Sequence, residues 1–169
     1  ASGYLPEHSL ASKGVAHAMG ADYLEQDVVL SKDGVPVVLH DIHLESTTNV
    51  AQHFPKRARN DGRFYAIDFE LAELRQLRLH ERTRIDSTGN EVAVFPQCFP
   101  VQETTFQIPT LAEEIAFIAG LDESTGRTTG LYVELKSPNW QTEQGQDIAV
   151  RVLEDLENSG YAGRTDQVY

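Results

Sequence analysis

Residues 23–28 read Tyr23-Leu24-Glu25-Gln26-Asp27-Val28, a short run that mixes large apolar side chains with acidic and amide ones. A brief aromatic and β-branched run of this kind predicts a buried strand that carries chemistry near its C-terminal end. Glu25 and Asp27 are two residues apart, so a strand directs both side chains to the same face. The stretch therefore predicts a strand with two carboxylates side by side.

Two further stretches end in ionisable residues in the same way, Val37-Val38-Leu39-His40-Asp41 and Leu131-Tyr132-Val133-Glu134-Leu135-Lys136. Glu134 and Lys136 are again two apart and share a face. If the strands are parallel, three carboxylates, His40 and Lys136 converge at one end of a sheet, a cluster that suits a hard divalent cation and a phosphate. Glu25 and Asp27 alone fit an ion-paired or solvent-facing strand end equally well; Glu134 shifts the balance toward a metal.

The order of predicted elements indicates α/β architecture. We expect a helix over 6–20, strands over 22–28 and 35–40 joined by a tight turn at 32–34, a helix begun by Thr110 with Glu113 as a capping box, a strand over 131–136, a helix over 147–159 and a strand starting at 166. Runs of βα units predict a parallel sheet. Residues 41–109 are too long for an ordinary connection, so we interpret the 41–109 segment as an insertion within one domain spanning 1–169.

Composition narrows the classes of partner. The chain has 169 residues with 26 acidic against 14 basic side chains and a net charge of -12. This balance argues against binding to nucleic acid or to anionic membranes, although a bound cation can still attract an anionic substrate. The single cysteine, Cys98, excludes an intrachain disulfide. No apolar run approaches the ~20 residues of a membrane span.

Five segments together resemble one family, in order and with matching spacing along essentially the whole chain. They are residues 1–9, 20–27, 38–41, 63–69 and 134–136, which read ASGYLPEHS, GADYLEQD, VLHD, RFYAIDF and ELK. They resemble the glycerophosphodiester phosphodiesterases, particularly the periplasmic bacterial type. The resemblance implies a TIM-barrel fold with the active site at the C-terminal ends of the strands. Such a barrel needs ~250 residues, so the chain is expected to form at most about half of one.

The resemblance also implies an activity. Family members hydrolyse glycerophosphodiesters to sn-glycerol 3-phosphate and an alcohol by histidine general acid/base catalysis, with Ca²⁺ as the usual cation and Mg²⁺ as an alternative. By the resemblance, Glu25, Asp27 and Glu134 are metal ligands, His40 is a catalytic histidine and Lys136 holds the phosphate. It further implies a small-molecule glycerophosphodiester partner, a role in glycerol and lipid metabolism, and a periplasmic or secreted location.

Three candidate residues have a plain structural alternative. Glu7 lies close to the site in the family pattern, but the dipole of the first helix alone would explain an acidic residue there. Trp140 follows Lys136 in a strand-to-helix loop and either lines the substrate mouth or packs as an ordinary aromatic. Without the resemblance, His40 would be read first as a strand-end histidine bonded to the backbone.

The chain also departs from the family pattern. The family places a His-Arg-Gly motif directly before the position of Ala1, and Ser46 stands where members commonly carry an arginine. Two alternatives therefore stay open: a sphingomyelinase-D-like phosphodiesterase, and a non-catalytic surface or binding protein on the same fold. Because an open half-barrel exposes strand edges, we expect the isolated chain to be unstable or to form a homo-oligomer.

Overall fold

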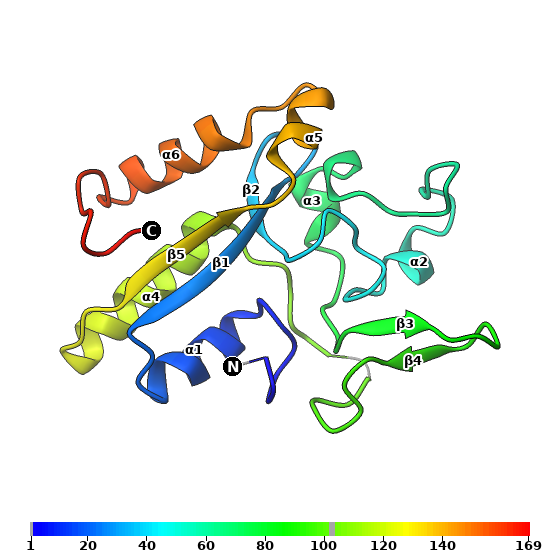
Figure 1. The fold of residues 1–169 in the computed structure, drawn as a ribbon, viewed down its shortest axis with the longest axis horizontal. Coiled ribbons are helices and arrows are strands. Elements are labelled where there is room, and N and C mark those ends of the chain that lie inside the picture. The colour runs from blue at the N-terminus through cyan, green and yellow to red at the C-terminus, as the bar shows by residue number, and fades with distance from the viewer. Residues whose placement is uncertain (1, 102–103) are drawn as a thin grey trace.

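The structure, a computed structural model, describes residues 2–101 and 104–169. A three-stranded sheet with the order β2-β1-β5 forms its centre (Figure 1). The elements, in chain order, are α1 Leu10–Ala18, β1 Tyr23–Leu30, β2 Pro36–Val38, α2 Val50–His53, the 3₁₀ helix η1 Ala66–Asp68, α3 Leu71–Leu74, β3 Thr83–Ile85, β4 Glu91–Ala93, α4 Leu111–Thr125, β5 Gly130–Leu135, α5 Pro138–Glu143 and α6 Ile148–Asn158.

Strands β1 and β5 pair in parallel, as predicted, with Asp27 opposite Glu134. Strand β1 extends to Leu30, two residues beyond the expected end at 28, because Val28 to Leu30 also pair with β2. Glu25 and Asp27 therefore lie within β1 rather than at its C-terminal end, which corrects that expectation. The start of a strand expected at 166 is reduced to one parallel bridge between Val168 and Leu131.

Strand β2 runs antiparallel to β1, so the prediction of an all-parallel sheet is wrong for this strand. The cause is the connection. Residues 31–35 make a tight turn in which Gly34 has φ +78° and its N–H donates to the carbonyl of Ser31, 3.0 Å away. A parallel neighbour would need a crossover of a dozen or more residues, whereas so short a turn reverses the chain.

Helix boundaries follow their caps. Helix α1 begins at Leu10 rather than at 6, because His8 has φ +55°, outside the helical range, and the Ser9 hydroxyl caps the helix by accepting from the N–H of Ser12. The predicted capping box of Thr110 and Glu113 is present at the start of α4. Helix α6 spans nearly the predicted range, and α5 was not predicted.

Two hydrophobic clusters lie on the two sides of the sheet. Leu24, Val28 and Leu131 pack toward α4 and α6, whereas Val29 and Val37 pack into the 41–109 segment. That segment lies beside the sheet and contains the β3–β4 hairpin (Figure 1). The buried residues that it contributes to this cluster are Leu44, Val50, Phe64, Ala66, Phe69, Leu74, Leu77, Leu79 and Ile108. The segment thus shares a core with the sheet.

Among the helices that the structure describes, none combines the length and the apolar character needed to cross a membrane.

Candidate active site

Three carboxylates from the two parallel strands meet on one face of the sheet. One oxygen each from Glu25, Asp27 and Glu134 lies within 4.8 Å of the others. The strand period places Glu25 and Asp27 on one face, and the register puts Glu134 beside Asp27. Asp27 is 1% exposed, whereas the other two face solvent. The cluster has the oxygen donors that hard divalent cations prefer.

The two oxygens of Asp27 have different surroundings. Oδ2 lies 2.9 Å from His8 Nε2, while Oδ1 is buried and accepts no hydrogen bond from the described residues. Burial alone would raise the pKa of Asp27, but the hydrogen bond from His8 and the charge of Lys136 hold that pKa below its usual range. A buried, ionised carboxylate oxygen that has only an ion pair with Lys136, at 3.4 Å, fits a cation ligand, because a buried charge needs compensation.

Lys136 is the cation that already faces this cluster. Its Nζ lies 2.7 Å from Glu134 Oε1 and 3.4 Å from Asp27 Oδ1. Partial burial disfavours its charge, but the hydrogen bond to Glu134 and the charge of Asp27 raise the pKa of Lys136 above its usual value. The lysine therefore stays protonated and could meet an anionic group brought to the same face.

His40 reaches the site through the antiparallel pairing of β2. The N–H of Leu39 donates to the carbonyl of Asp27, 2.9 Å away, which puts His40 next to the acidic cluster. The His40 side chain is 52% exposed, and its Nδ1 lies 2.6 Å from Asp41 Oδ1. Because an ionised carboxylate only accepts, Nδ1 carries the proton, and Nε2 has no hydrogen-bond partner among the described residues.

Asp41 is strongly held in its ionised form. Burial opposes ionisation, but hydrogen bonds from Arg82 and His40 lower the pKa of Asp41 to about 2. Arg82 Nη1 lies 2.6 Å from Asp41 Oδ2, and the same guanidinium contacts both oxygens of Glu7. Glu7 is thus engaged by an arginine rather than by the N-terminus of α1, which corrects the helix-dipole alternative.

A cavity of about 320 Å³ lies at this site and is lined in part by Glu7, His8, Glu25, Asp27 and His40, but not by Glu134 or Lys136. The structure therefore brings four of the predicted site residues to one cavity, and it places Glu134 and Lys136 close to one of them, Asp27. His8 was missed by the sequence reasoning, although it follows Glu7 in one of the matching segments. Arg82 was also missed, and nothing in its sequence neighbourhood marks it.

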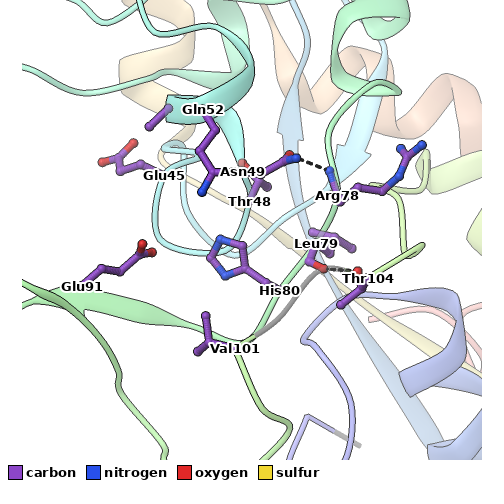
Figure 2. A pocket seen from close by; sticks show the side chains of 11 residues that line it. Glu45, Thr48, Asn49, Gln52, Arg78, Leu79, His80, Glu91, Val101 and Thr104 are labelled. Carbon is purple, nitrogen blue, oxygen red and sulfur yellow. Dashed lines mark hydrogen bonds between the residues drawn. The ribbon is translucent and has the colours of Figure 1, made fainter.

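A larger cavity, about 490 Å³, lies in the 41–109 segment and is shown in Figure 2. Two of its polar groups serve the fold: the Asn49 side chain accepts from the N–H of Arg78, and the Thr104 hydroxyl donates to the carbonyl of Leu79 (Figure 2). None of the predicted site residues lines it. The residues that line the smaller cavity therefore make it the better candidate for the active site, although it is smaller.

Trp140 lies on α5 and does not line the smaller cavity. Its ring stacks on Tyr65 with a centroid separation of 5.2 Å and an interplanar angle of 21°. The guanidinium of Arg59 lies 4.2 Å from the Tyr65 centroid, and Asp68 holds it by two bonds of 2.7 Å. Trp140 thus joins α5 to the 41–109 segment.

A buried ion pair supports β1 from the other side. Lys13 Nζ lies 3.1 Å from Glu114 Oε1 and also donates to the carbonyl of Glu25. The Gln26 amide donates to the same carboxylate oxygen at 3.1 Å. This link from α1 to α4 holds the strand segment that carries the carboxylates.

Comparison with known proteins identifies close relatives. The sequence profile of the "Glycerophosphoryl diester phosphodiesterase family" matches residues 1–169. A glycerophosphodiester phosphodiesterase from Haemophilus influenzae is 47% identical over 169 residues, which is 100% of this chain and 46% of that protein. One from Treponema pallidum is 44% identical over the same length, with 47% of that protein covered. The chain spans about half the length of these relatives.

Solved structures agree with this result. A candidate glycerophosphoryl diester phosphodiesterase from Silicibacter pomeroyi superposes with a TM-score of 0.72 at 25% identity, over 99% of this chain and 53% of that one. A phosphodiesterase from Oleispira antarctica, in complex with the product sn-glycerol-3-phosphate, gives 0.56 at 28% identity, over 92% and 48%. The predicted fold class, α/β and part of a TIM barrel, is confirmed.

Proposed function

Since the chain belongs to the glycerophosphoryl diester phosphodiesterase family, we propose that its protein hydrolyses glycerophosphodiesters to sn-glycerol 3-phosphate and an alcohol. The observation that carries the proposal is the meeting of Glu25, Asp27 and Glu134 on one face of the sheet, where Glu25 and Asp27 line a cavity together with His40. The product bound to the Oleispira antarctica relative supports a small-molecule substrate of this class.

The proposed cofactor is Ca²⁺, with Mg²⁺ possible. Glu25, Asp27 and Glu134 would hold it, and the buried oxygen of Asp27 that accepts no hydrogen bond from the described residues supports this assignment. When bound, such a cation supplies positive charge that polarises a phosphoryl oxygen. Six to eight oxygen ligands suit Ca²⁺, so substrate oxygens and water would complete the shell around the three carboxylates.

His40 would move the proton. With Nδ1 bonded to Asp41, its Nε2 can accept a proton from an attacking hydroxyl or return one to the leaving alcohol. Lys136 would hold the phosphate, because its protonated ammonium lies on the same face as the carboxylates. Glu7 would contact the substrate from the wall of the smaller cavity. Trp140 does not line the cavity, so it would contact only a part of the substrate that extends out of it.

The location and pathway remain part of the proposal. The resemblance to periplasmic bacterial members supports a periplasmic or secreted protein that serves glycerol and lipid metabolism. Fractionation of the native cells, with this protein followed by antibody, tests that placement, and recovery from the cytoplasm alone would contradict it.

The direct test is release of glycerol 3-phosphate from glycerophosphocholine, with Ca²⁺, with Mg²⁺ and after chelation. Both this chain and any longer product of its coding sequence should be assayed. His40→Asn should remove activity by about 10²- to 10⁴-fold, the usual contribution of an acid/base group. His53→Asn is the matched control, because His53 lies exposed on α2.

Two results would redirect the proposal. Turnover of sphingomyelin in liposomes without turnover of glycerophosphocholine would favour the sphingomyelinase-D-like alternative. No turnover of either substrate by the longest product, with either cation, would leave the binding role as the better account.

A further inference from the structure

Arg82 joins two parts of the active site that are far apart in the chain. It directly precedes β3 in the 41–109 segment. Its Nη2 and Nε donate to the two oxygens of Glu7 at 2.6 and 3.0 Å, and its Nη1 donates to Asp41 Oδ2 at 2.6 Å. The side chain is 20% exposed, so water screens these contacts less than it would on an open surface.

The contact with Asp41 constrains the catalytic candidate itself. Asp41 Oδ1 accepts from His40 Nδ1, while Oδ2 accepts from Arg82 and, at 3.2 Å, from the hydroxyl of Ser46. Each carboxylate oxygen therefore has its own donor, which fixes the plane of the carboxylate. A fixed carboxylate in turn fixes the ring and the tautomer of the histidine that it bonds.

We propose that Arg82 is a positioning residue for His40, supplied by the 41–109 segment. It holds Asp41 and Glu7 so that the imidazole keeps its proton on Nδ1 and presents Nε2 to the reacting groups. The proposal rests on the proposed function, because it gives His40 the proton-transfer role described above.

The shape of the guanidinium explains why an arginine serves here. Three of its N–H-bearing atoms reach two carboxylates at once, which the single ammonium of a lysine cannot do with the same geometry. Nη1 also lies 3.5 Å from Ser46 Oγ, beside the position where family members commonly carry an arginine. Arg82 thus brings a guanidinium next to Ser46 from 36 residues further along the chain.

A purely structural role is the competing account, since Arg82 also ties the start of α1 to the end of β2. The two accounts differ in what they expect at the imidazole. A structural tie affects unfolding, whereas a positioning residue also changes which nitrogen of His40 carries the proton. The test must therefore read the tautomer and the turnover number, as well as stability.

The experiment uses the longest active product that contains this chain and compares Arg82→Met, Arg82→Lys and the control Arg84→Met, whose side chain is exposed on β3. For Arg82→Met we expect kcat to fall about 10- to 100-fold, the usual cost of losing a partner that orients an active-site ligand, with a smaller change in KM. Imidazole ¹⁵N signals should show His40 losing its preference for Nδ1–H. Arg82→Lys should recover part of both effects, and Arg84→Met should match the unsubstituted protein.

The outcomes separate the two proposals. A folded Arg82→Met protein with unchanged kcat and unchanged His40 tautomer overturns the role of Arg82. If Arg82→Met fails to fold, Arg82→Lys decides, since identity with the unsubstituted protein in both readouts would equally overturn it. If the unsubstituted protein hydrolyses no glycerophosphodiester, the proposed function fails, while the ¹⁵N comparison still reports whether Arg82 sets the tautomer.

Discussion

The β1–β5 pair and the 41–109 segment both bring charged groups to the site, but they hold them by different means. On the strands, backbone register puts Asp27 opposite Glu134 whatever their charge. In the segment, the N–H of Val94 holds the backbone of Arg82, but it is ion pairs with Glu7 and Asp41 that place the guanidinium. A group held by register stays when its neighbours are neutralised, whereas a group held by ion pairs depends on its partners' charge.

The largest effect is expected in a test of whether the β1–β5 pair and the 41–109 segment unfold together. Leu131→Ala in β5 and Leu74→Ala in α3 each remove a fully buried side chain, from opposite clusters. Val29 and Val37 of the sheet belong to the same cluster as Leu74, so this cluster is joined to the sheet. We therefore expect both variants to lose about 2–5 kcal/mol of unfolding free energy in one transition. Urea unfolding followed by far-UV circular dichroism and tryptophan fluorescence measures this. Two separated transitions would show that the 41–109 segment folds as its own unit.

The next test concerns the strand-held carboxylates. Asp27→Asn keeps an oxygen for His8 but removes the charge that a cation would bind. We expect Ca²⁺ affinity to fall about 100-fold or more, beyond the roughly 10- to 100-fold cost of an outer partner. Isothermal titration calorimetry measures it, with Glu123→Gln as a control of equal charge change on the exposed side of α4. Equal affinities for Asp27→Asn and the control would remove Asp27 from the ligand set.

The ion-paired groups of the 41–109 segment should make the unfolding free energy depend on pH in the acid range. The pKa of Asp41 is lowered to about 2, so its ionised form favours the folded state. This stabilisation is complete above the ordinary carboxyl pKa of about 3.9 and is lost as the pH falls toward 2. Over that interval the unsubstituted protein should lose up to about 2 kcal/mol more than Asp41→Asn. If the unfolding free energies of the two proteins fall equally over this pH range, the contacts of Asp41 with Arg82 and His40 do not lower its pKa.

The smallest expected effect lies where the two regions meet. The stack of Trp140 on Tyr65 links α5 to the 41–109 segment. A double-mutant cycle with Tyr65→Ala and Trp140→Ala should give a coupling of about 0.5–1.5 kcal/mol in unfolding free energy. A coupling near zero would mean that the stack adds no stability, and a loss of substrate affinity with no coupling would return Trp140 to the substrate mouth.

The strand-held half of the site was predictable because it rests on local periodicity. Glu25, Asp27 and Glu134 each lie in a run whose period of two sets the face, and the connection between β1 and β5, which ends in α4, is long enough for the crossover that a parallel pair needs. Likewise Thr110 with Glu113 marks a helix start by a reciprocal pair of hydrogen bonds within four residues. Such signals need no knowledge of distant contacts.

The rest depended on contacts that no local pattern encodes. Arg82 meets Glu7 across 75 residues and Asp41 across 41. His8 reaches Asp27 only because it adopts a left-handed φ before α1. The direction of β2 was readable in principle, since its turn is too short for a crossover, but the βα alternation elsewhere concealed it.

The position of Lys136 carries one more consequence. Its ammonium lies between Asp27 and Glu134, so a divalent cation that binds these carboxylates must push it aside or share them with it. An anion that draws the ammonium away lifts this competition. By thermodynamic reciprocity, the factor by which that anion strengthens cation binding equals the factor by which the cation strengthens anion binding. If the proposed function holds, the lysine would make the two ligands heterotropic effectors of each other on one face of the sheet.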